Sequence, residues 1–211
     1  MEISNGKIKA VFFDLGKVIL SFSHDDIVGR LLSCADPDSR RPDELHRYLF
    51  DMEDGLCNLY DAGLISSEDF YKEIDSRFNT GVDYNGFVPL WNGIFEGIPG
   101  VPEIIREVRR KRPVYLLSNI NELHWEHIRG RYQVLSELDG LVLSCEVKAR
   151  KPEPAIYRVA METAGVGPGE SIFVDDLQIN IDAARSHGIK GIAFTGLDRL
   201  RADLTALGLA G

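Results

Sequence analysis

Two patterns of apolar and polar positions follow one another along the chain. From residue 97 onward, short β-branched runs such as "PVYLLS", "GLVLS", "SIFVD" and "KGIAF" alternate with longer segments that have apolar residues every three or four positions. A run of the first kind also lies at residues 9–13. Alternating strands and helices are typical of βαβ units. The pattern therefore predicts an α/β fold with a mostly parallel sheet covered by helices on both faces.

Residues 20–96 have a different, helical pattern. The segments "DDIVGRLLSC", "PDELHRYLFDMEDGL" and "SSEDFYKEIDSRF" carry apolar residues at spacings near three and four, and no convincing strand lies between them. In "SSED", Ser66 or Ser67 is placed to accept hydrogen bonds from the amides of a first helical turn. This part of the chain is predicted to be a helical insertion after the first strand.

Charge and cysteine content exclude several classes of protein. The chain has 24 Lys and Arg against 33 Asp and Glu, a net charge of −9, which argues against nucleic acid and anionic membranes as partners. Its three cysteines lack CxxC spacing and are expected to be buried thiols rather than disulfides or zinc ligands. No run approaches the ~18 apolar residues of a membrane span, and the first residues lack the apolar run of a secretory signal. A cytoplasmic protein is expected.

Polar residues stand at the carboxyl ends of the predicted strands, where ligands bind in an open parallel sheet. Each has an ordinary structural interpretation, as a turn cap, a helix cap or a solvated lysine. The residues are Asp14 and Gly16 after the first strand, Ser118 and Asn119 after the second, Lys151 in the loop after the third, and Asp175 and Asp176 after the fourth.

Taken together, these residues indicate a common site. Three carboxylates that converge repel one another unless a divalent cation neutralises them, and hard oxygen ligands suit Mg²⁺. One carboxylate can then attack an electrophile. A lysine with short hydroxyl or amide donors can hold the oxygens of a phosphoryl group. The combination predicts phosphoryl transfer.

The stretches "VFFDLGKV", "YLLSNIN", "RKPEPAIY" and "FVDDLQINIDAARSHG" occur in the order and spacing of the four motifs of the haloacid dehalogenase-like superfamily. The chain resembles a phosphatase of that family with a helical C1-type cap, over essentially all of its 211 residues. The resemblance implies a Rossmann-like doubly wound core of residues 1–20 and 97–211, with an all-helical cap at residues 21–96. It also implies a small phosphorylated metabolite as the substrate, with a sugar phosphate slightly preferred.

The resemblance further implies a role for each motif residue. Asp14 would be the nucleophile that forms an aspartyl-phosphate, and it would also bind Mg²⁺. Asp176 would be the main acidic ligand, with Asp175 beside it and the backbone carbonyl of Gly16 completing the set. The groups that hold the phosphate would be Ser118, the amide of Asn119, and Lys151, which would also neutralise the nucleophile.

Gly16 departs from the family pattern, because most of these phosphatases have a second aspartate there to protonate the leaving group. That proton transfer is worth ~10²- to 10⁴-fold. The family includes a branch with the same "FDLG" motif that resembles a sugar-1-phosphate phosphatase. A sugar departs from its anomeric carbon more easily than a simple alkoxide does, so such a substrate needs a proton donor less. Alternatively His24, Asp25 or Asp26 substitutes for the aspartate, although capping a helix is the plainer role for that cluster.

Two other reactions of the superfamily fit this sequence less well than hydrolysis. The paired Asp175 and Asp176 argue against a metal-free haloalkanoate dehalogenase, and Gly16 argues against a mutase, which relies on the missing aspartate. The alternative to a phosphatase is a weakly active or inactive homologue that binds a phosphorylated ligand or a protein partner. Trp91 is expected to be buried near the base of the insertion, with lining of the substrate cleft as the second possibility. The sequence does not indicate an oligomeric state.

Overall fold

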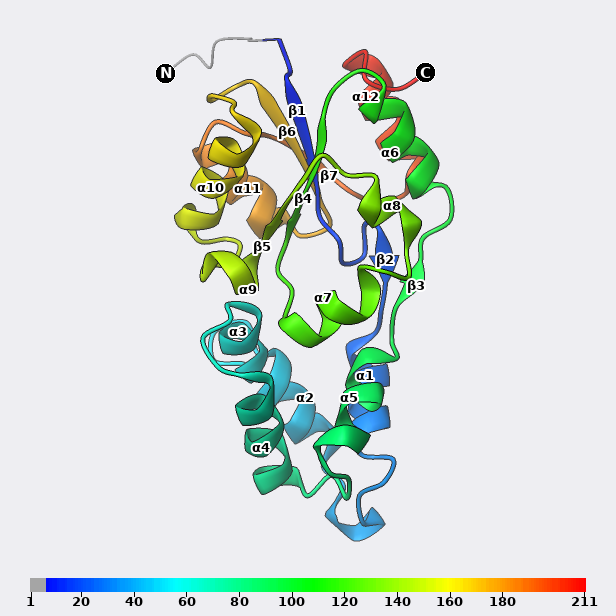
Figure 1. The fold of residues 1–211 in the computed structure, drawn as a ribbon, viewed down its shortest axis with the longest axis vertical. Coiled ribbons are helices and arrows are strands. Elements are labelled where there is room, and N and C mark those ends of the chain that lie inside the picture. Colours follow the sequence, from blue (N-terminus) through cyan, green and yellow to red (C-terminus); the bar gives the residue numbers. More distant parts are fainter. Residues whose placement is uncertain (1–6) are drawn as a thin grey trace.

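A five-stranded parallel sheet forms the centre of the computed structural model, which describes residues 7–211 (Figure 1). Its strands lie in the order β5-β4-β1-β6-β7. The α/β fold predicted from the alternating pattern and the doubly wound core implied by the resemblance are both confirmed. The strands are β1 (Ala10–Phe13), β4 (Val114–Ser118), β5 (Gly140–Leu143), β6 (Ser171–Asp175) and β7 (Lys190–Ala193).

Helices cover both faces of this sheet. On β1, Val11 and Phe13 pack into one buried cluster while Ala10 and Phe12 pack into another, as the two-residue period of a strand requires. The burial of both faces explains why this strand is a continuous apolar run. The first cluster includes residues of α6 (Val101–Arg109) and α12 (Leu197–Ala206), and the second includes residues of α10 (Pro154–Ala164) and α11 (Gln178–Ser186). The connections also contain α7 (Glu122–Ile128), α8 (Gln133–Ser136) and α9 (Ser144–Val147).

The strand order places a topological switch point beside β1. The chain runs from β1 outward to β4 and β5, and then returns to the other side of β1 to form β6 and β7. Loops on the two sides of such a point diverge and leave room for a ligand at the carboxyl ends of the strands. Asp14 follows β1 directly and therefore lies at this point.

A second group of helices lies below the core in Figure 1 and has its own buried cluster. Its aromatic centre includes Phe70, Phe87 and Trp91, with the Phe70 and Trp91 ring centroids 4.8 Å apart. Ser66 is the N-cap of α4 and accepts a hydrogen bond from the amide of Asp69 at 3.1 Å, so Ser66 rather than Ser67 caps that helix. The helices are α1 (His24–Leu31), α2 (Pro42–Phe50), α3 (Leu56–Asp61), α4 (Ser67–Phe78) and α5 (Tyr84–Asn92), with a 3₁₀ turn at Pro37–Ser39.

The structure differs from the sequence prediction within "PDELHRYLFDMEDGL". Helix α2 ends at Phe50, and the side chain of Asp51 then accepts hydrogen bonds from the amides of Glu53 and Asp54 at 2.9 and 3.1 Å. This local bonding competes with the helix and turns the chain. A Cβ added at Gly55 would lie 2.5 Å from the backbone oxygen of Asp51, so the turn requires glycine there.

Two short strands mark the ends of the helical group. β2 (Leu20–Ser21) and β3 (Glu96–Gly97) pair antiparallel, with Leu20 opposite Gly97 and Ser21 opposite Glu96. These strands were not expected, because two residues are too few to produce an alternating pattern. The chain therefore leaves the core and returns to it at adjacent positions.

The cysteines are only partly as expected. All three are free thiols, with Cys57 buried and Cys145 partly buried. The expectation of burial is wrong for Cys34, which lies in an exposed bend after α1. Within residues 7–211, none of the helices has the length and apolar character needed to traverse a lipid bilayer.

Candidate active site

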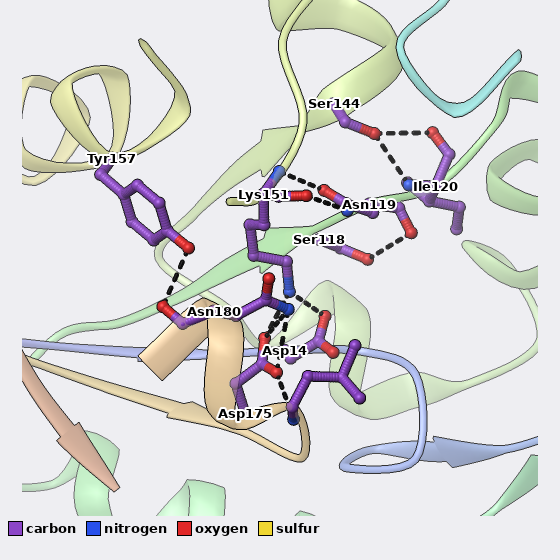
Figure 2. A network of polar contacts seen from close by, with 10 residues as sticks. Asp14, Ser118, Asn119, Ile120, Ser144, Lys151, Tyr157, Asp175 and Asn180 are labelled. Atoms are coloured by element: carbon purple, nitrogen blue, oxygen red, sulfur yellow. Dashed lines mark hydrogen bonds and ion pairs between the residues drawn. The ribbon is translucent and has the colours of Figure 1, made fainter. Parts of the chain in front are cut away.

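An amine and two carboxylates meet at the carboxyl edge of the sheet (Figure 2). The Nζ of Lys151 lies 2.7 Å from Oδ1 of Asp14 and 2.7 Å from Oδ2 of Asp175. All three residues are buried. They come from the loop after β1, the loop before α10 and the end of β6, so the fold brings together groups that are far apart in the sequence.

Asn119 holds the backbone of Lys151 in place. Its Oδ1 accepts a hydrogen bond from the amide of Lys151 at 2.7 Å, and its Nδ2 donates to the carbonyl of Lys151 at 2.9 Å. The sequence pointed only to the backbone amide of Asn119, because a side-chain clasp between two loops leaves no local signal. The lysine is thus fixed at its backbone by this clasp and at its amine by two carboxylates.

The two adjacent aspartates after β6 have different surroundings. Asp175 accepts hydrogen bonds from the amide of Leu177 at 2.8 Å, from Nδ2 of Asn180 at 3.1 Å and from Lys151. Asp176 is partly buried, and no other residue of the described chain donates a hydrogen bond to its carboxylate. Asp176 therefore keeps its oxygens available for a ligand, whereas Asp175 is largely occupied.

The carboxylates carry more negative charge than Lys151 can balance. Oxygen atoms of Asp14, Asp175 and Asp176 all lie within 4.8 Å of one another. Burial raises the pKa of Asp14 to about 7, with Lys151 opposing the rise and Asp175 adding to it. Burial and then Asp175 also raise the pKa of Asp176 above its ordinary value. A hard divalent cation would relieve this excess, and the all-oxygen donor set fits Mg²⁺.

Lys151 stays charged in this setting. Burial alone would lower its pKa, but the charges of Asp14 and Asp175 and their hydrogen bonds outweigh burial and raise the pKa above its ordinary value. The amine is therefore a permanent positive charge at the centre of the cluster. It can neutralise an anion bound next to Asp14.

Ser118 and Gly16 lie at the same edge as this cluster. β1 pairs with β4, so the end of β4 at Ser118 is next to the loop that follows β1. The Ser118 hydroxyl is buried and donates a long hydrogen bond of 3.3 Å to the carbonyl of Asn119. Neither Ser118 nor Asn119 caps the next helix, because Asn121 is the N-cap of α7. The weakly bound hydroxyl can be redirected toward a ligand.

A cavity of about 90 Å³ adjoins this cluster and reaches into the helical group. Gly16 and Asn119 line it on the core side, while Asp61 and Trp91 line it from α3 and α5. Trp91 is buried, as expected, and it also lines this cavity; its role in lining a substrate cleft stays a prediction. Apolar side chains that line the cavity include Phe22, Ile27, Phe50, Ile94, Phe95 and Ile120.

Sequence reasoning missed Asp61 and Asn121. Nδ2 of Asn121 donates to Oδ1 of Asp61 at 2.9 Å, which connects α7 to the end of α3. Neither residue stands directly at a strand end, and α3 was not predicted as a helix. No sequence signal distinguished Asp61 from the other acidic residues of the insertion.

The three residues considered as substitutes for the missing aspartate differ in position. Asp25 and Asp26 are exposed in the first turn of α1, and the cap of that helix is Ser23, which accepts from the amide of Asp26 at 3.3 Å. Only His24 lines the cavity. Its ring stacks on Phe50 with centroids 4.0 Å apart, and burial lowers its pKa to about 4. The His24 ring is therefore neutral near pH 7.

Comparison with known proteins gives consistent results. The family description "haloacid dehalogenase-like hydrolase" matches residues 8–188. The D-ribitol-5-phosphate phosphatase of Bacteroides thetaiotaomicron is 28% identical over 192 residues, which cover 87% of this chain and 90% of that protein. Flavin mononucleotide hydrolase 1 of Arabidopsis thaliana is 26% identical over 153 residues, which cover 71% of this chain and 61% of that protein.

A solved structure is similar over most of its length. It is a haloacid dehalogenase family enzyme of Bacteroides thetaiotaomicron in complex with magnesium and inorganic phosphate. It matches with a TM-score of 0.76 and 28% identity, and the match covers 88% of this chain and 93% of that one.

Proposed function

The chain belongs to the haloacid dehalogenase-like hydrolases, and we propose that it hydrolyses a small phosphomonoester through an aspartyl-phosphate on Asp14, with Mg²⁺ as cofactor. As an enzyme it is a phosphoric monoester hydrolase, in line with the phosphatase and the hydrolase to which it is similar. The observation that carries the proposal is the position of the Lys151 amine, 2.7 Å from both Asp14 and Asp175.

In the proposed reaction, a carboxylate oxygen of Asp14 attacks phosphorus and the bond to the leaving oxygen breaks. Lys151, Ser118 and the amide of Asn119 hold the phosphoryl oxygens, where negative charge is spread in the transition state. Water then attacks the aspartyl-phosphate, which releases phosphate and restores Asp14. Asn119 keeps Lys151 oriented through both steps by its two backbone hydrogen bonds.

The metal would be held by Asp14, Asp175, Asp176 and the carbonyl of Gly16. When bound, Mg²⁺ supplies positive charge that polarises the phosphoryl group. Asp176 is proposed as the main acidic ligand, because Asp175 already accepts hydrogen bonds from three residues. Asp175 would then act mainly by orienting Lys151.

We propose that residues 21–96 act as a cap that encloses the leaving group over a core of residues 1–20 and 97–211. The cavity supports this division, since its walls come from both parts. A sugar phosphate is the preferred substrate class, and the similarity to a D-ribitol-5-phosphate phosphatase supports it. Other small phosphorylated metabolites fit the same chemistry.

Phosphate release from a panel of sugar and nucleoside phosphates tests the proposal. Activity is expected with Mg²⁺, loss in EDTA, and recovery when Mg²⁺ is restored. Asp14→Asn should abolish turnover while the circular dichroism spectrum stays that of the wild type, because the amide is nearly isosteric but a poor nucleophile. Activity of the Asp14→Asn variant within about tenfold of the wild type, with metal saturating, would contradict covalent catalysis by Asp14.

The second candidate function rests on Gly16 alone. A chain that binds Mg²⁺ and phosphate but hydrolyses no ester on the panel would be a ligand-binding homologue rather than an efficient enzyme. The charged residues around Lys151 favour the phosphatase, because a binding protein has no need of a nucleophile beside a buried lysine.

A further inference from the structure

The walls of the cavity leave few polar groups free for a substrate. Both side-chain functions of Asn119 are bound to Lys151. The two nitrogens of His124 contact Nδ2 of Asn121 and the carbonyl of Trp91, each at 3.1 Å. Asn121 in turn uses its oxygen on the amide of His124 and its Nδ2 on Asp61. These side chains hold the wall together and are not available to a ligand.

Asp61 is the exception among the charged groups of the wall. Its Oδ1 accepts the hydrogen bond from Asn121, but Oδ2 accepts none from any residue of the part 7–211. The backbone of Asp61 is also fixed, because the Ser144 hydroxyl donates to its carbonyl. Asp61 lines the cavity, so a rigidly held carboxylate with one oxygen that accepts no hydrogen bond from the described chain stands in a wall that is otherwise mostly apolar.

The groups that surround Asp61 do not neutralise it. Arg150 contributes an attraction that is weaker than the effect of burial. Cys57 and Cys145 face it as neutral thiols, because burial raises the pKa of each above its ordinary value. His124, which shares Asn121 with it, is also neutral, because burial lowers its pKa to about 3. A hydrogen-bond donor from a ligand would supply the partner that Oδ2 lacks.

We infer that Asp61 determines substrate specificity by accepting a hydrogen bond from a polar hydrogen of the leaving group, a hydroxyl or a protonated amine. The inference rests on the proposed phosphatase function and narrows it. The substrate class is a phosphomonoester with a short leaving group that carries such a donor and otherwise presents carbon to Phe22, Phe50 and Trp91. Gly16 and Asp61 line the same cavity, so the donor stands on the part of the leaving group that enters it.

The test compares glycerol 1-phosphate with propyl phosphate, which lacks both hydroxyl groups. The wild type is expected to prefer glycerol 1-phosphate by tenfold or more in kcat/KM, mainly through a lower KM. In Asp61→Ala and Asp61→Asn, the ratio should fall to about threefold or less. Asp43→Asn is the matched control, because Asp43 is exposed on α2 and does not line the cavity, and it should keep the wild-type ratio.

The pH dependence of the same ratio separates recognition from a structural role. Burial raises the pKa of Asp61 to about 6. The wild-type ratio should therefore increase from pH 5 to pH 7 as the carboxylate ionises, and it should stay flat in Asp61→Asn. Lys151 stays charged over this range. Titration of Asp14 affects both esters alike and cancels in the ratio. 3-Aminopropyl phosphate serves as the amine probe, and a preference for it over glycerol 1-phosphate identifies the donor as an ammonium group.

Two results would overturn the inference. One is a wild-type ratio near one for both donor-bearing esters, and the other is a ratio that survives in both Asp61 variants. Failure of the proposed function looks different, since even 4-nitrophenyl phosphate would then release no phosphate. In that case the same esters are compared by calorimetric binding in the presence of Mg²⁺, and equal affinities in wild type and Asp61→Asn would overturn the role of Asp61.

Discussion

At the scale of single residues, Gly16 shapes both the chemistry and the packing of the site. It offers no side chain to protonate a leaving oxygen, and the ring of Phe22 occupies the space where one would begin. A Cβ built on Gly16 would lie 2.8 Å from Cε1 of Phe22. Phe22 itself packs against His24 and Phe95 with centroid distances of 5.4 and 5.8 Å. An aspartate at this position therefore either displaces the Phe22 ring or is accommodated by a smaller residue at position 22.

This arrangement predicts a strong dependence on the leaving group. Aryl phosphates should be hydrolysed far faster than alkyl phosphates, because acidic leaving groups depart without a proton, and log rate should fall steeply as leaving-group pKa rises. The double variant Gly16→Asp with Phe22→Ala should have a shallower slope than Phe22→Ala alone. Initial rates over a series of esters give both slopes. A flat wild-type slope would show that another group already donates the proton.

At the scale of elements, His124 joins α7 to α5. Because the Asp61 carboxylate can only accept, Nδ2 of Asn121 must donate to it, and the same nitrogen then donates to Nδ1 of His124. Nε2 of His124 therefore carries the proton and donates to the carbonyl of Trp91. The ring also stacks on Trp91 with centroids 4.8 Å apart. A second proton on Nδ1 would meet a donor, which agrees with the low pKa of this histidine.

The buried contacts of His124 predict that the folded protein becomes less stable in acid. Burial lowers the pKa of His124 from 6.5 to about 3, so below pH 6.5 the unfolded chain binds a proton that the folded chain does not. The free energy of unfolding therefore decreases as the pH is lowered, by about 2 kcal/mol between pH 7 and pH 5. Asp61 has the opposite effect on stability as the pH is lowered, because burial raises its pKa to about 6 and the folded chain then binds a proton before the unfolded chain does.

Comparing the wild type with His124→Gln separates the contribution of His124 to the pH dependence of stability from the contributions of groups such as Asp61. Urea unfolding at pH 7 and pH 5 should show the variant gaining about 2 kcal/mol relative to the wild type as the pH is lowered. Equal pH dependence in the two proteins would mean that His124 is protonated in the folded state.

The elements themselves were largely predictable, whereas the cavity was not. Long stretches such as "SSEDFYKEIDSRF" and "SIFVD" carry their own period, and motif order then placed Asp14, Lys151 and Asp175 at one edge. The clasp of Asn119 on Lys151 joins residues 32 apart in the chain, and the bond of Asn121 to Asp61 joins residues 60 apart. Such contacts depend on how distant parts of the chain pack together, and the local spacing of apolar residues does not predict that packing.

At the scale of the whole molecule, the excess of carboxylate charge links metal binding to stability. A ligand that binds only the folded chain stabilises it by about 2.7 kcal/mol at a hundred times its dissociation constant. The oxygens that would bind Mg²⁺ come from the loop after β1 and from the end of β6 with the residue that follows it, so binding would tie together two segments separated by most of the sequence.

Mg²⁺ should therefore raise the thermal midpoint by roughly 5–10 °C at that concentration. Asp176→Ala should retain less than half of this rise, because the variant loses the carboxylate with the most available oxygens. The control is Asp182→Ala, which removes an exposed carboxylate of α11 that pairs with Arg185. Scanning calorimetry with and without Mg²⁺ measures each shift. An undiminished rise in Asp176→Ala would reassign the principal ligand.

The pairing of β2 with β3 has a consequence for how this architecture can diversify. Leu20 and Gly97 are direct partners, so the chain crosses between the sheet and the helical group twice at a single place. The distance that the intervening segment must close is fixed by this ladder and is independent of its length. Lengthening a closed loop costs free energy only slowly, about 0.6 kcal/mol per doubling. Segments of other sizes and sequences can therefore be exchanged between these two positions during evolution, which allows the recognised molecule to change while the five strands and their catalytic edge stay the same.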